Sequence, residues 1–135
     1  HGKFDGANLD EEQKTLRTFY RHLLRVARSE KAITMGDMYD LTYAQGEGFN
    51  KHEQYAFIRH WEDETLLVII NFHDREQHMR VRIPNDAFVY LGIDEIKSCQ
   101  ATDLLRGEKW SIPFNTSDAI ELTLPAWRGV ILKIQ

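Results

Sequence analysis

The chain has 135 residues, the size of a single domain that can bury a sizeable core. Hydrophobic residues make up 42% of it, and the net charge is -4 at pH 7. The chain should therefore fold, and it has no overall positive field, which disfavours nucleic acid and anionic membranes as partners. The longest apolar run, Leu66–Ile70, is too short to span a bilayer, so we expect a soluble chain with no membrane partner.

Residues Asp10–Lys31 have the pattern of one N-terminal amphipathic α-helix. Six apolar side chains recur at helical spacing and should form one face: Leu16, Phe19, Tyr20, Leu23, Leu24 and Ala27. Asp10 followed by Gln13 fits a capping box, and Gly36 should close the segment. An apolar face of this size needs a cover. We expect it to dock on the rest of the fold, to pair two chains as a homodimer, or to meet a larger partner.

The chain after Gly36 predicts a mainly β structure. Short runs rich in β-branched and aromatic residues alternate with turn residues, as in an antiparallel sandwich or barrel. Nine candidate strands can be marked, which we take as one too many, so we expect about eight: Met38–Ala44, Tyr55–Trp61, Leu66–Asn71, Met79–Ile83, Phe88–Leu91, Ile96–Thr102, Lys109–Ile112, Ala119–Leu124 and Gly129–Ile134.

Two hairpins are predicted inside this β region. In the first, the polar loop Glu62–Glu64 joins Ala56–Trp61 to Thr65–Ile70. The second strand of this hairpin is almost uninterruptedly apolar, so we expect it to be central and covered on both faces. The second hairpin is Leu104–Trp110, where Gly107 should supply the positive φ that such a turn needs.

Motifs for catalysis, metals or cofactors are missing from the pattern. His52–Glu53 opens a zinc-binding motif that Ala56 fails to complete, and His73 with His78 would supply only one pair of ligands. The serines lie in no nucleophile motif, and the acidic residues cluster in expected turns, where carboxylates are normally solvated. We therefore predict no catalytic residue, no metal and no cofactor. The single Cys99 reads as a small apolar residue and leaves the cellular compartment open.

Three tryptophans could contact a ligand. Trp61 and Trp127 lie where core or interface packing is expected, because one alternates with Phe57 and the other follows Pro125 at a strand entry. Trp110 lies beside the Gly107 turn. It is the best candidate for an exposed platform on which a sugar ring could stack.

The order of several motifs along the chain resembles the C-terminal region of the α-amylase family of glycoside hydrolases. Leu16–Arg28, followed by Ala32–Ile33 and Gly36, is similar to the last barrel helix of that family and its exit. Further matches follow in the family order: Tyr55–Arg59 (aromatic, any, aromatic, any, Arg), Leu66–Phe72 (an apolar run ending in Asn-Phe), Val81–Pro84 and Leu124–Leu132, while Gly2–Gly6 resembles the loop before the helix.

This resemblance implies that residues 1–35 are a loop and the final helix of a catalytic barrel. Residues 36–135 would then form a Greek-key β-sandwich that packs against that barrel. The family's catalytic acids lie on barrel strands before the last helix, and no position here corresponds to them. The implied role is a non-catalytic domain that stabilises the barrel of an enzyme acting on α-glucans. The parent's linkage preference, its hydrolase or transferase preference and its localisation would be encoded outside this segment.

Two other functions are compatible with the residues. The chain could be an independent carbohydrate-binding module that recognises starch-like glycans, with Trp110 as the contact. It could also be an autonomous protein-interaction domain that uses the apolar face of the helix. In both cases the α-glucan or protein partner would be bound without any reaction on this chain.

Overall fold

The computed structural model describes residues 11–135 and, within the first helix, omits the side chains of Glu11, Glu12, Thr15, Leu16, Leu23 and Ala27. The expected capping residue Asp10 lies outside the described residues. The elements in chain order are α1 (Glu11–Ser29), α2 (Lys31–Thr34), β1 (Asp37–Asp40), the 3-10 helix η2 (Thr42–Ala44), β2 (Gln54–Trp61), β3 (Glu64–Asn71), β4 (Gln77–Val81), α3 (Asn85–Leu91), β5 (Ile96–Asp103), β6 (Lys109–Phe114), β7 (Ile120–Leu124) and β8 (Arg128–Ile134).

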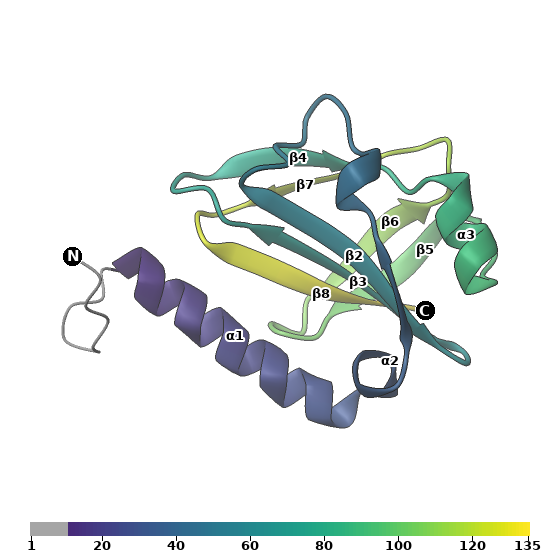
Figure 1. The fold of residues 1–135 in the computed structure, drawn as a ribbon, viewed down its shortest axis with the longest axis horizontal. Coiled ribbons are helices and arrows are strands. Elements are labelled where there is room, and N and C mark those ends of the chain that lie inside the picture. Colours follow the sequence, from purple (N-terminus) through teal and green to yellow (C-terminus); the bar gives the residue numbers. More distant parts are fainter. Residues whose placement is uncertain (1–10) are drawn as a thin grey trace.

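The eight strands of residues 11–135 form two antiparallel sheets, which confirms the expected fold class. The large sheet has the order β1-β2-β3-β8-β5-β6, and the small one is the ribbon β4-β7 (Figure 1). The last strand, β8, returns to the middle of the large sheet between β3 and β5. Pairing between strands so far apart in the chain is typical of Greek-key folds.

The predicted hairpin β2–β3 forms, but its turn is one residue shorter than the expected loop Glu62–Glu64. Trp61 pairs with Glu64, so the turn consists of Glu62 and Asp63, and Glu62 takes the left-handed conformation with φ 54°. Every residue of β3 from Thr65 to Asn71 is buried. The prediction of a central strand covered on both faces is therefore confirmed.

Two separate hydrophobic clusters cover the two faces of β3. Leu67 and Ile69 belong to the larger cluster, which lies between the large sheet, the β4–β7 ribbon and α3. Leu66, Val68 and Ile70 belong to the smaller cluster, which also contains Phe19 of α1 and Ala32 of α2. Figure 1 shows the resulting layers, with α1 along one side of the large sheet and the ribbon on the other.

One predicted strand is wrong. Phe88–Leu91 lies in helix α3, which begins after Pro84 and ends at Gly92 in the left-handed conformation (φ 67°). Ala87, Phe88 and Leu91 are buried while Val89 and Tyr90 are exposed, which is helical and not alternating spacing. The Pro and Gly that flank the run were the available signal for this helix.

Two predicted boundaries also differ. The expected strand Met38–Ala44 ends at Asp40, and the chain then forms η2. The expected helix Asp10–Lys31 stops at Ser29, because Glu30 is extended (φ -109°, ψ 113°) and α2 starts in a new direction. None of the helices among the described residues is both long enough and apolar enough to cross a membrane.

Candidate interdomain interface

Residues 30–36, which run from the end of α1 through α2 to the start of β1, are held against the large sheet, and we call them the elbow. Its main support is Arg59 of β2. The Arg59 guanidinium donates to the carbonyl oxygens of Ala32 (3.1 Å), Ile33 and Gly36 (3.1 Å). The last carbonyls of a helix have no partners inside it, so a planar cation with several donors satisfies them and faces the negative end of the helix dipole.

Two further side chains from neighbouring strands fix the elbow. Glu64 of β3 accepts the Ala32 N–H at 3.0 Å, and Lys133 of β8 forms an ion pair with Glu30 at 2.9 Å. The hydrogen bond to Glu30 raises the pKa of Lys133. Three adjacent strands thus each contribute one charged group that contacts the elbow.

Gly36 allows this close approach. A Cβ atom at this position would lie 2.6 Å from the carbonyl oxygen of His60 and closer still to that of Ala32. The glycine expected to close the helical segment is therefore required by the contact between the elbow and β2.

Phe19 anchors α1 to the sheet at a second point. Its side chain is buried in the smaller cluster, and its ring lies over Gly129 of β8. A Cβ atom at position 129 would come within 2.6 Å of Phe19 Cζ and 3.0 Å of the Ile69 carbonyl oxygen. Because Gly129 has no side chain, β8 leaves room for the Phe19 ring, and we call this space the Phe19 seat.

Gly129→Ala should therefore lower the free energy of unfolding by about 1–3 kcal/mol, because the extra methyl overpacks this seat. Chemical unfolding measures the change. Gly46→Ala is the matched control, since nothing lies within 4 Å of that position. Combining Gly129→Ala with Phe19→Leu should recover part of the loss. Equal stability of the Gly129→Ala and Gly46→Ala chains would contradict this packing of α1.

Only part of the predicted apolar face of α1 is buried. Phe19 is 5% exposed, whereas Tyr20 is 43% and Leu24 66% exposed. The side chains of Leu16, Leu23 and Ala27 lie outside the described ones. Apolar surface of α1 thus remains uncovered after Phe19 has docked on the sheet.

A groove of about 450 Å³ opens between α1 and the loops beside it. Phe19, Leu105 and Trp127 supply apolar walls, and the rim carries basic side chains, including Arg106 and Arg128. Arg106 donates to Asp103 (3.1 Å) and to the Gly129 carbonyl (3.0 Å). The groove therefore borders the Phe19 seat and lies along the contact between α1 and the large sheet.

Asn71 forms a second junction at the far end of β3. It is fully buried, and its amide nitrogen lies 3.1–3.2 Å from the carbonyl oxygens of Arg75, Leu124 and Pro125. Its Oδ1 accepts the His73 N–H at 3.0 Å. One side chain thus ties the end of β3 to the loop that enters β8.

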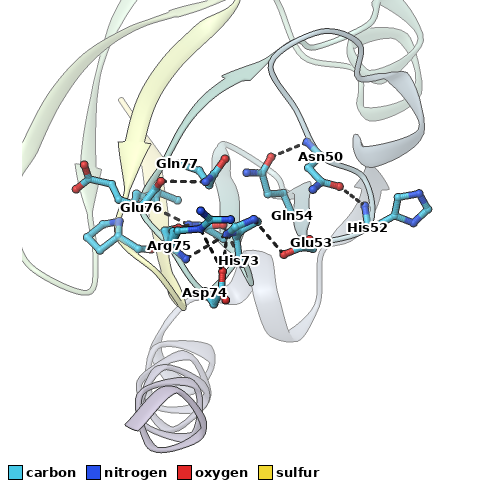
Figure 2. A network of polar contacts seen from close by, with 12 residues as sticks. Asn50, His52, Glu53, Gln54, His73, Asp74, Arg75, Glu76 and Gln77 are labelled. Atoms are coloured by element: carbon cyan, nitrogen blue, oxygen red, sulfur yellow. Dashed lines mark hydrogen bonds and ion pairs between the residues drawn. The ribbon is translucent and has the colours of Figure 1, made fainter.

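Figure 2 shows the polar network around this junction. His73 Nε2 lies 3.5 Å from Glu53 Oε2, and His73 Nδ1 lies 3.1 Å both from Asp74 Oδ1 and from the Arg75 nitrogen that donates to it. His78 instead contacts Thr123 and Glu121 on the β4–β7 ribbon. The two histidines therefore have different partners, and in residues 11–135 no group of three or more His, Cys, Asp or Glu is placed to hold a metal.

The three tryptophans and Cys99 all pack against other side chains of the fold. Trp61 packs on the smaller cluster, and Trp127 makes an edge contact with Phe72 at 6.4 Å. Trp110 is half-buried and packs against the larger cluster. Its contact with sugar stays a prediction. Cys99 is buried, as expected of a small apolar residue, and burial raises the pKa of its thiol.

Sequence reasoning quoted Arg59 and Asn71 only as parts of motifs and missed their roles. For Arg59 a signal was present. It alternates with Phe57 and Trp61 along β2, so it is a cation on an otherwise apolar face. Such a side chain must find acceptors nearby, which here are the elbow carbonyls.

The structure defines a small all-β domain that clamps a long helix to one face of its sheet. Residues 49–135 match the family described as the α-amylase C-terminal all-β domain. The chain therefore belongs to this family, which confirms the resemblance seen in the sequence. No match was found among curated proteins.

Solved α-amylases have a similar fold. The Geobacillus thermoleovorans enzyme, crystallised with acarbose, aligns with 82% of this chain at 17% identity and a TM-score of 0.57. The maltogenic α-amylase AmyB of Thermotoga neapolitana aligns with 87% at 12% identity and 0.61, and an Anoxybacillus α-amylase with 94% at 18% and 0.57. The alignments cover 20%, 25% and 23% of those chains, so this chain spans a quarter or less of their length.

Proposed function

We propose that this chain is the non-catalytic C-terminal region of an α-amylase-like glycoside hydrolase acting on α-glucans. In this proposal α1 belongs to the catalytic barrel, and residues 36–135 form the domain that packs against the barrel and stabilises it. The observation that carries the proposal is the division of α1. Phe19 and the elbow fasten one side of the helix to the sheet, while Tyr20 and Leu24 remain exposed for the barrel. In the isolated chain the same exposed side chains are available to a second copy.

The carboxylates support a non-catalytic role. A retaining hydrolase needs one carboxyl group that stays protonated and a second, ionised one about 5 Å away. Glu62 and Asp63 are solvent-exposed in a turn, and Glu64 is bound to the elbow. The hydrogen bond from His78 lowers the pKa of Glu121, which is the opposite of what a general acid requires.

In the parent enzyme, Leu24→Gln should lower the melting temperature and leave turnover below that temperature within about twofold. The substitution removes up to about 2 kcal/mol of apolar burial at the barrel contact but touches no reacting group. Arg25→Gln is the matched control, because Arg25 is the exposed residue next to Leu24 and the same new side chain is introduced there.

Thermal unfolding and starch hydrolysis measured on both variants decide the proposal. If Leu24→Gln melts at the same temperature as Arg25→Gln, the exposed side of α1 is not a barrel contact. If this 135-residue chain alone hydrolyses starch at the rate of a complete amylase, its non-catalytic role is wrong.

A further inference from the structure

Three tyrosines from separate elements meet on the surface. Tyr39 comes from β1, Tyr43 from η2 and Tyr90 from α3, and we call these three residues the tyrosine patch. Tyr43 is 56% and Tyr90 63% exposed. Tyr39 packs against the larger cluster, so the patch lies on the opposite side of the large sheet from the smaller cluster that contains Phe19. It therefore stays accessible when α1 is covered.

The rings hold one another in a curved arrangement. The Tyr39 ring centroid lies 6.1 Å from that of Tyr43 and 5.7 Å from that of Tyr90, with interplanar angles of 58° and 49°. The Tyr39 and Tyr43 hydroxyls are hydrogen-bonded to each other. This bond raises the pKa of Tyr39 to about 12. The patch thus presents tilted aromatic faces beside hydroxyl groups.

The surroundings of the patch favour a neutral, hydroxyl-rich ligand. Asp40 and Asp86 lie close enough to Tyr39 to act on its hydroxyl electrostatically, so they repel anions and can accept hydrogen bonds from hydroxyl groups. Lys51 Nζ donates to the Tyr43 carbonyl at 3.2 Å and supplies a donor at the same edge. Aromatic faces next to such donors and acceptors match a sugar, whose C–H faces are apolar and whose rim is polar.

We propose that the tyrosine patch binds a neutral α-glucan chain, separately from any active site. The choice of α-linkage rests on the proposed function and on the tilt between the rings. A flat β-linked glucan stacks on coplanar rings, whereas a curved α-linked chain fits faces that are inclined to one another. The binding is shallow, because the rings are open to solvent, and we expect an affinity in the millimolar range.

Titration calorimetry of this chain with maltoheptaose tests the proposal. Tyr90→Ala should weaken binding by about fivefold or more, since each stacked ring contributes about 1 kcal/mol. Tyr43→Phe keeps the ring and should retain most of the affinity, while the pKa of Tyr39 returns toward 10. Tyr20→Ala is the matched control, because Tyr20 is an exposed tyrosine on α1, and it should bind like the unsubstituted chain.

Amide NMR shifts of the unsubstituted chain give a second readout that needs no variant. Maltoheptaose should perturb residues 37–44 and 85–92 together. Absence of heat at millimolar sugar, unchanged binding by Tyr90→Ala, or loss of binding on Trp110→Ala alone would overturn the assignment. Equal affinity for cellohexaose would overturn the α-linkage, and self-association abolished by Tyr90→Ala without sugar binding would assign the patch to a second copy. These outcomes do not depend on the melting result for Leu24→Gln.

Discussion

Arg59→Met is expected to lower the free energy of unfolding by about 3 kcal/mol. The new side chain has a similar length but no donor, so the carbonyls of Ala32, Ile33 and Gly36 lose a charged partner at once. Hydrogen bonds to charged groups contribute about 1.5–3 kcal/mol each, and three bonds from one group are not additive. Urea unfolding at pH 7 measures the change.

Two variants separate the role of Arg59 from a general effect of removing an arginine. Arg59→Lys keeps the charge but cannot reach three carbonyls in one plane, so its loss should be intermediate. Arg82→Met removes a single bond to the exposed Glu47 carbonyl (3.0 Å) and should cost less than about 1 kcal/mol. If Arg59→Met costs no more than Arg82→Met, the elbow is not held by Arg59.

Asn71→Asp should destabilise the chain by about 3–5 kcal/mol at pH 7. The substitution keeps the shape but places a carboxylate oxygen against the carbonyl oxygens of Arg75, Leu124 and Pro125 in a fully buried site. The folded state would favour the protonated carboxyl group more than the unfolded state does. The penalty should therefore be complete above the raised pKa of the folded state, shrink as the pH falls from there toward about 4, and reach its minimum below about 4, where both states are protonated.

The difference in unfolding free energy between Asn71→Asp and the unsubstituted chain should depend on pH, and this dependence makes the prediction specific. Asn50→Asp is the control, because Asn50 is exposed and its side-chain oxygen only accepts the His52 N–H, which a carboxylate also accepts. Its effect should stay within about 0.5 kcal/mol at all pH values. A loss for Asn71→Asp that does not change with pH would show that the amide donors face something other than the three carbonyls.

Arg59 and Asn71 show how the motifs of this chain act. Both lie in segments that resemble the α-amylase family, and both bind backbone carbonyls at a junction. Arg59 joins the helical region to the sheet, and Asn71 joins the end of β3 to the entry of β8. Both roles are structural, in agreement with the non-catalytic function proposed above.

Much of the β architecture could be predicted because it depends on local patterns. The unbroken apolar run of β3 indicates a strand covered on both faces. Gly107 (φ 77°) marks the turn between β5 and β6, because glycine adopts a positive φ without strain. The same reasoning failed for Phe88–Leu91. A short apolar run by itself suits a strand or a buried helix equally well; Pro84 and Gly92 at its two ends favour the helix, and packing on the larger cluster completes the selection.

By itself, then, the sequence determined the fold class, the two hairpins and the helical character of residues 11–29, since periodicity and turn chemistry act over a few neighbouring residues. Only the tertiary structure decided where α1 ends, which carbonyls Arg59 binds, and that Tyr39, Tyr43 and Tyr90 meet. Each of these depends on groups far apart in the chain, and their free energy appears only when the sheet has brought them together.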